Sequence, residues 1–105
     1  MINYNYKYLD LKYSLIDIML ININSNVLDI SYNVEEFTLE IQVILLEGSN
    51  LSKEVKVNIR DRLSHFKIEI IELHLTKEKF NENIGEWQPK YYKWLNYLLF
   101  SKAEA

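Results

Sequence analysis

Residues 27–47, VLDISYNVEEFTLEIQVILLE, decide the fold of this chain because they hold two runs in which apolar and polar residues alternate. Such alternation is typical of a half-buried β-strand, since successive side chains point to opposite faces of a sheet. Glu35 and Glu36 separate the runs, so the stretch predicts a β-hairpin, although Glu-Glu is poor turn chemistry. The predicted apolar face contains Leu28, Ile30, Tyr32, Val34, Phe37, Leu39, Ile41, Val43 and Leu45.

The segment before the hairpin predicts a helix from Tyr8 to about Ile23. Its apolar residues recur at helical spacing and cover a wide arc, and only a narrow stripe is polar. A helix with this pattern is expected to be buried over most of its surface. The asparagine-rich residues 22–26 then supply a break.

Two further elements are predicted after the hairpin. Leu51–Phe66 shows helical spacing, with Ser52 placed to cap the helix, although the alternation in Val55–Ile59 leaves a strand as the alternative. Lys67–Thr76 alternates as a strand does, and its phase slips at Ile70 and Ile71, which predicts a bulge.

A polar loop at residues 76–86 leads to the segment WQPKYYKWLNYLLF, residues 87–100. Pro89 suits the first position of a helix, and the predicted helix has an apolar arc. That arc, which we expect to pack in the core, includes Tyr91, Trp94, Leu95 and Leu98. Tyr97 and Phe100 fall off it, so exposure and partner contact both remain open for them. A final strand at Trp94–Ser101 is the alternative, because aromatic residues also favour sheets.

The order helix, two strands, helix, strand and a last element of either kind predicts one domain, residues 1–105, of the α+β class. We expect a small antiparallel sheet of three or four strands with helices packed mainly on one face. The other face would stand in water. Its predicted polar side chains lean acidic and are Asp29, Ser31, Glu40, Gln42 and, after the bulge, Glu72 and His74.

Composition and charge narrow the range of functions. Twelve Lys and Arg against 15 Asp and Glu leave a net charge of −3, so no general field attracts nucleic acid or an anionic membrane, and a charged partner is expected to be basic. Cysteine is absent, which excludes disulfides and thiolate sites and is consistent with a reducing compartment. The most apolar run, residues 15–23, is too short to span a bilayer, so we expect a cytoplasmic protein.

No stretch of the chain matches a catalytic, cofactor or metal motif. His65 and His74 are nine residues apart and lack the ligand spacing of known metal sites. The carboxylates are scattered, and with two isolated glycines the chain has few loops from which to build a pocket. We therefore expect no metal, no cofactor and no enzymatic activity.

Small acidic, cysteine-free chains in which a helix leads into a strand hairpin, then a helix and a further strand, resemble bacterial immunity proteins. These belong to contact-dependent growth inhibition and other polymorphic toxin systems. The resemblance is one of layout and is carried by VLDISYNVEEFTLEIQVILLEG, NLSKEVKVNIRDRLSHF and KIEIIELHL. It implies a cytoplasmic inhibitor that binds the C-terminal toxin domain of a cognate effector, often a nuclease, and occludes its active site or substrate groove.

The candidate partner-binding residues follow from the strand and helix phases, because the resemblance transfers no specific residue. An acidic surface would complement the positive cleft of a nuclease and raise the association rate. We expect Asp29, Glu40 and Glu72 to supply this charge. Contact area is expected from His74, Trp87 and Tyr97.

Two other classes of function remain open. The chain is also consistent with a small adaptor or structural protein that homo-oligomerises through its C-terminal aromatic segment, with Tyr97 and Phe100 in the contact. A small enzyme is the third class, and it would require a deep pocket that joins His74 to two carboxylates.

Overall fold

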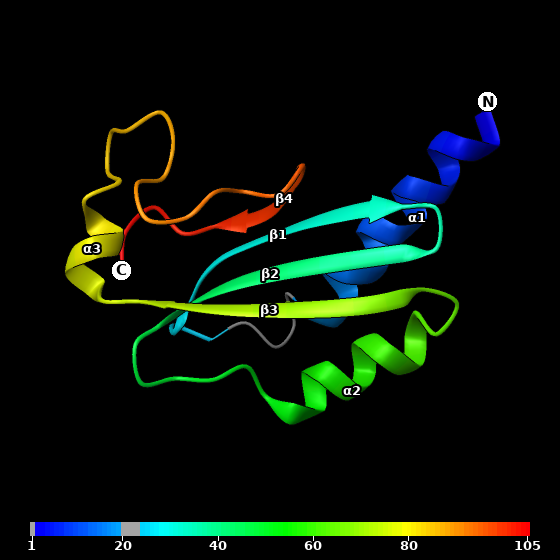
Figure 1. Ribbon diagram of the computed structural model, residues 1–105, viewed down its shortest axis with the longest axis horizontal. Coiled ribbons are helices and arrows are strands. Elements are labelled where there is room, and N and C mark those ends of the chain that lie inside the picture. Colours follow the sequence, from blue (N-terminus) through cyan, green and yellow to red (C-terminus); the bar gives the residue numbers. More distant parts are fainter. Residues whose placement is uncertain (1, 20–23) are drawn as a thin grey trace.

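The structure is a computed structural model that describes residues 2–19 and 24–105, with the side chains of the first helix described from residue 10 onward. Figure 1 shows a sheet flanked by helices. In chain order the described elements are α1 (Ile2–Met19), β1 (Val27–Glu35), β2 (Thr38–Leu46), α2 (Lys53–Arg62), β3 (Lys67–Leu75), α3 (Lys77–Asn81) and β4 (Tyr97–Ser101). The first helix is confirmed and begins earlier than predicted; its predicted last residues, 20–23, lie outside the described residues.

The sheet has four strands in the order β3-β2-β1-β4, so the α+β class is confirmed. β1 pairs antiparallel with both β2 and β4, whereas β2 and β3 are parallel. The expectation of a purely antiparallel sheet is therefore wrong for β3. The reason is α2, which lies between β2 and β3 in the chain. This helix returns the chain to the end of the sheet where β2 begins, so β3 runs in the same direction as β2.

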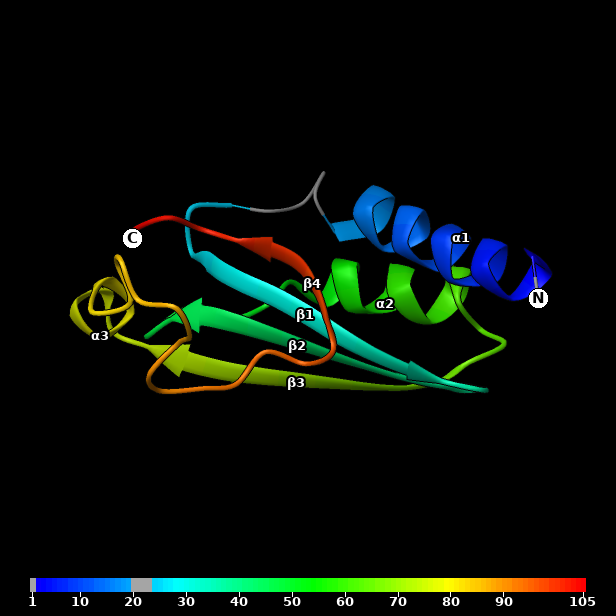
Figure 2. The same ribbon diagram turned by 90° about the horizontal axis from the view of Figure 1, so that it is seen from above.

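The main core lies between the sheet and the pair α1 and α2, which cover the same face (Figure 2). Its buried members come from both helices, from β1 and β2, and from Leu63 directly after α2. They are Leu11, Leu15, Ile18, Met19, Val27, Ile30, Tyr32, Leu39, Ile41, Val43, Leu45, Val55, Ile59 and Leu63. Ser52 caps α2 as predicted, because its hydroxyl accepts a hydrogen bond from Val55 N at 3.1 Å.

The predicted hairpin is present, with its turn at Glu36 and Phe37. Glu36 has φ of 50°, the left-handed region that L-residues rarely adopt. Phe37 was expected on the apolar face, but it belongs to the turn and is 68% exposed. That expectation is wrong because the two-residue turn consists of Glu36 and Phe37, so β2 begins only at Thr38.

β3 contains no bulge. Its register with β2 runs without a shift from Thr38↔Lys67 to Leu46↔Leu75. Alternation along an unbroken strand therefore places Glu72 and His74 on the helix-covered face, with Ile70, and not on the opposite face. The apolar neighbours Ile70 and Ile71 point to different faces, and both are partly buried.

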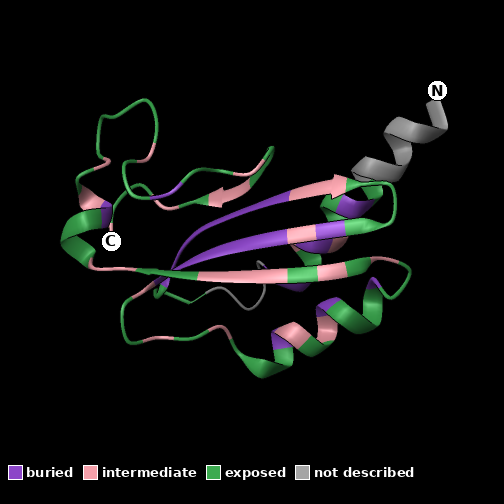
Figure 3. Ribbon diagram, in the orientation of Figure 1, coloured by how far each residue is buried: buried purple, intermediate pink, exposed green. Residues whose placement is uncertain are grey.

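The second face of the sheet carries a smaller core of its own. Leu28 and Ile44 pack there against Phe80 and Tyr92. Phe80 belongs to α3, a short helix in a stretch predicted to be a polar loop, and Thr76 caps it by accepting a hydrogen bond from Lys79 N at 3.2 Å. In Figure 3 much of β1 and β2 is coloured as buried, because both faces of these central strands are covered, whereas β3 is coloured as intermediate and exposed.

The last element is a strand, so the predicted helix after Pro89 is wrong and the alternative is confirmed. β4 pairs with β1 from Asp29↔Ser101 to Tyr32↔Tyr97, with one register shift. Among residues 2–19 and 24–105, no helix is both long and apolar enough to cross a bilayer.

Candidate protein-binding surface

The polar stripe of the second face, Asp29, Ser31 and Asn33 of β1 with Gln42 of β2, does not stand in water as predicted. Asp29, Ser31 and Gln42 are buried. Residues 85–96, here called the aromatic loop, cross this stripe on the way from α3 to β4 and bond to each of its members. The sequence pattern identified the stripe correctly but not the segment that covers it.

Asp29 is the centre of this contact. Its Oδ2 accepts hydrogen bonds from Trp94 Nε1 at 2.7 Å and from Tyr92 Oη at 3.1 Å. Burial raises the pKa of Asp29, and the hydrogen bonds from Trp94 and Tyr92, with the nearby Ser101 hydroxyl across the β1–β4 pair, offset this only in part. Burial and the adjacent Asp29 carboxylate also raise the pKa of Tyr92. The predicted exposure of Asp29 is therefore wrong, and the side chain serves as an internal anchor.

The rest of the stripe fixes the backbone of the aromatic loop. Leu95 N donates to Ser31 Oγ at 3.0 Å, and Asn96 N donates to Asn33 Oδ1 at 2.6 Å. Gln42 Nε2 donates to the carbonyl oxygen of Lys93 at 2.8 Å. Side chains of two strands thus satisfy backbone groups that a loop would otherwise leave to water.

An open groove of about 610 Å³ lies along this anchored loop, lined by Trp87, Gln88, Pro89, Tyr92, Lys93 and Trp94. Trp87 is 92% exposed, and Trp94 is 39% exposed with its ring nitrogen turned inward to Asp29. The core position predicted for Trp94 is wrong, as it is for Tyr91 and Leu98, which are also exposed. The groove therefore presents indole and proline surface to solvent on a fixed backbone.

Glu40 and Tyr97 lie apart from this groove. Glu40 is partly buried at the far end of the stripe, accepts a hydrogen bond from Asn33 Nδ2 at 3.2 Å, and has Glu69 of β3 as its neighbour across the strand pair. Tyr97 begins β4 and stacks on Tyr32 with ring centroids 5.2 Å apart. Tyr97 as a whole remains 44% exposed, so it is available for partner contact.

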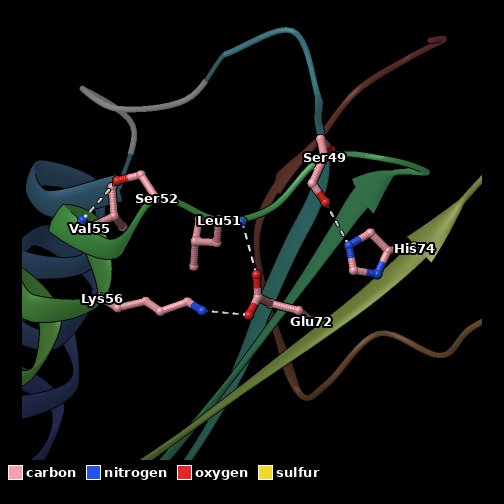
Figure 4. Close-up of polar contacts among 7 residues, drawn as sticks. All are labelled: Ser49, Leu51, Ser52, Val55, Lys56, Glu72 and His74. Atoms are coloured by element: carbon pink, nitrogen blue, oxygen red, sulfur yellow. Dashed lines mark hydrogen bonds and ion pairs between the residues drawn. The ribbon is translucent and has the colours of Figure 1, made fainter.

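Glu72 and His74 belong to another contact, shown in Figure 4. Glu72 accepts a hydrogen bond from Leu51 N at 2.9 Å and pairs with Lys56 Nζ at 2.7 Å. Burial alone would raise the pKa of Glu72, but the hydrogen bonds from Lys56 and Leu51 and the charges of Lys56 and His74 outweigh it and hold the pKa below its usual value.

His74 Nε2 donates to the carbonyl oxygen of Ser49 at 2.7 Å. Both side chains therefore fasten the segment before α2 to the edge strand β3. Their predicted place beside Asp29 and Glu40 is wrong because β3 has no bulge to change its phase. The six predicted site residues are thus distributed over separate parts of the molecule rather than gathered in one patch.

The structure also bears on the other kinds of site. In the described part of the chain, no three His, Asp or Glu side chains come together as metal ligands would. No protein-family model matches this chain, and no curated protein or solved structure shows a significant match to it.

Proposed function

We propose that this protein is an immunity protein that binds a cognate toxin domain through the aromatic loop and occludes its active site. The toxin domain is expected to be basic, as a nuclease is, and the complex to form in the cytoplasm without catalysis by this chain. The layout resemblance supplies the class of partner. The exposed indole of Trp87 on an anchored loop supplies the binding surface.

Trp87 is the observation that carries the proposal. A tryptophan that is 92% exposed leaves nearly all of its ring in water. With Pro89 and the exposed Trp94 in the same groove it forms a contiguous apolar surface, the kind that marks interaction sites. Tryptophan is also among the residues enriched at interface hot spots.

The polar stripe holds the end of the loop at residues 93–96. Asn83 holds the backbone on both sides of Trp87, because its carbonyl oxygen accepts a hydrogen bond from Glu86 N at 2.9 Å and its Oδ1 accepts one from Lys90 N at 2.8 Å. Less conformational entropy is then lost on binding, which favours affinity.

Charge supports a basic partner. The chain has a net charge of −3. Glu40 and Glu69 are cross-strand neighbours on the part of the second face near the hairpin turn, where like charges repel each other. A cationic region of the partner, separate from the part that contacts the groove, would relieve this repulsion and speed association at low ionic strength.

The test uses the C-terminal domain encoded by the gene directly upstream, produced alone and together with this protein. Co-expression should restore growth to cells poisoned by that domain, and calorimetry should give a one-to-one complex. Trp87→Ala should weaken binding by about 2 kcal/mol, or roughly 30-fold in Kd. Ile84→Ala is the matched control, because Ile84 is also exposed but lies outside the groove.

Three results are informative in different ways. Growth that is not restored would reject the inhibitor function. A complex whose Kd is unchanged by Trp87→Ala would reject the aromatic loop as the contact while leaving the function intact. Glu40→Lys should slow association more at low than at high salt, and an unchanged rate would remove the acidic end of the stripe from the interface.

A further inference from the structure

The aromatic loop is held to the sheet through strand side chains alone. Its five hydrogen bonds to the strands go to the side chains of Asp29, Ser31, Asn33 and Gln42. Among the described residues, no hydrogen bond between two backbone groups joins residues 85–96 to a strand. Figure 2 shows the loop, in orange, on the side of the sheet away from α1 and α2. The loop can therefore leave the sheet without breaking the ladders that join the four strands.

Little apolar surface opposes such a separation. Of residues 85–96, only Tyr92 is buried, and it packs in the second core with Phe80. The surface beneath the rest of the loop is the polar stripe, which water can solvate. Each hydrogen bond that the loop gives up is replaced by one to water, so it contributes only modestly to closure. Gly85, with φ of 78°, lies at the first end of the loop and has the backbone freedom of a hinge.

We propose that the aromatic loop opens as one unit about Gly85 and the start of β4, while the four-stranded sheet stays folded. Local openings of this kind occur where a segment has few buried apolar contacts. In the open form Tyr92 and Trp94 leave Asp29, so the groove beside Trp87 loses two of its walls. A ligand of the groove binds the closed form and shifts the population toward it. The opening is a property of this chain and does not rest on the proposed function.

Opening is coupled to the ionisation of Asp29. Burial raises the pKa of this carboxyl in the closed form, and the hydrogen bonds from its neighbours offset burial only in part. In the open form water reaches the carboxyl, so its pKa returns toward the ordinary value of 3.8. The contribution of Asp29 to closure is therefore present below pH 3.8 and is lost as pH rises through the closed-form pKa. Opening increases over that range.

The other groups around Asp29 do not reverse this trend. Trp94 and Tyr92 of the loop and Ser101 of β4 are the side chains that act on its carboxyl. Of these, Tyr92 titrates, and its own pKa is raised above the ordinary value of 10, so it stays neutral throughout. Lys102, which follows Ser101, donates to a backbone carbonyl oxygen before β1 and not to Asp29. A change in opening between acid and neutral pH therefore reports on Asp29.

Hydrogen exchange of backbone amides, followed by NMR on the unmodified protein, tests the proposal. Leu95 N and Asn96 N donate to Ser31 and Asn33, so both amides are protected while the loop is closed. After correction for the intrinsic exchange rate, the two amides should give the same opening constant, larger than that of the β1–β2 ladder. This constant should rise at least about fivefold from pH 4 to pH 7.

Variants test whether the loop opens as a unit and whether Asp29 causes the pH dependence. Ser31→Ala removes the acceptor of Leu95 N and should raise the opening constant at Asn96 about fivefold, although Asn96 keeps its own acceptor. Ser49→Ala is the matched control, because the Ser49 hydroxyl bonds within the separate loop after β2, and it should leave Asn96 unchanged. Asp29→Asn should remove the rise with pH.

Three results would overturn the proposal. Loop amides with the same opening constant as the β1–β2 ladder would mean that the loop opens only when the sheet unfolds. An Asn96 amide that does not respond to Ser31→Ala would mean that the loop does not open as a unit. An opening constant of the unmodified protein that is equal at pH 4 and pH 7 would break the link to Asp29, and this result does not depend on whether any variant folds.

Discussion

Replacing Tyr92 by phenylalanine removes one hydroxyl from the centre of the loop anchor and leaves the ring in place. Tyr92 is buried against Leu28, Ile44 and Phe80, so the phenylalanine ring fills the same space. The lost contact is the 3.1 Å hydrogen bond to Oδ2 of the fully buried Asp29. A hydrogen bond to a charged group contributes about 1.5–3 kcal/mol, so we expect a loss of about 2 kcal/mol at neutral pH.

This loss depends on pH in a way that tests its cause. The folded-state pKa of Asp29 lies above the ordinary value of 3.8, so the carboxyl favours folding below 3.8 and this contribution is lost as pH rises through the folded pKa. Without the Tyr92 donor that pKa rises further. The free energy of unfolding of Tyr92→Phe should therefore fall increasingly below that of the unmodified protein between about pH 3 and neutral pH.

Urea denaturation followed by tryptophan fluorescence at several pH values measures both effects. A loss of about 2 kcal/mol corresponds to a fall in Tm of about 10 °C for a domain of this size. Tyr91→Phe is the matched control, because the Tyr91 hydroxyl bonds to Glu82 on an exposed surface, and it should cause no measurable loss. A Tyr92→Phe loss that is the same at pH 3 and pH 7 would refute the role given to the Asp29 carboxylate.

Three further variants test other features of the fold. Asp29→Asn should become steadily more stable relative to the unmodified protein as pH rises above 3.8, measured by the same urea titrations, since the amide avoids burying a charge; a gap that narrows with pH would contradict this. Glu72→Gln should behave oppositely. The pKa of Glu72 is lowered, so its contribution is present above 4.5 and lost in acid, and the variant should lose about 1 kcal/mol at neutral pH and nothing in acid, because its ion pair with Lys56 is partly exposed. Glu36→Gly should raise the free energy of unfolding by about 0.5 kcal/mol by relieving the left-handed backbone, and a shift of the urea midpoint to lower concentration would argue that no strain exists there.

Alternation along the chain predicted which residues share a face, but it could not say what covers that face. Asp29, Ser31 and Gln42 were correctly placed together on the polar side of the hairpin. They are buried because residues 51 to 65 positions away in the chain return to bond with them. Nothing in a local window of sequence contains that information.

The errors in β3 and β4 have a similar origin. The slip in alternation at Ile70 and Ile71 predicts a bulge, but the strand is regular there, because both faces of the sheet are partly covered and each takes an apolar residue. In the last segment, aromatic residues fit helical and strand spacing equally well. The pairing partner β1 decides for a strand, and its paired residues lie 65 to 72 positions earlier in the chain.

The polar stripe is buried, but it still shapes the exposed groove of the aromatic loop. The buried Asp29 carboxylate has a raised pKa, so it lowers the free energy of unfolding at neutral pH. We therefore ask what else this side chain does in the structure. That role is geometric, because one carboxylate oxygen fixes Tyr92 and Trp94 together, and with them the wall of the groove beside Trp87. The anchoring side chains of Asp29 and Tyr92 are buried, whereas Trp87 is exposed and belongs to neither hydrophobic core. If the groove is the contact surface proposed above, substitutions at Trp87 and Gln88 should change its affinity for a partner without disturbing the bonds of Asp29 to Tyr92 and Trp94.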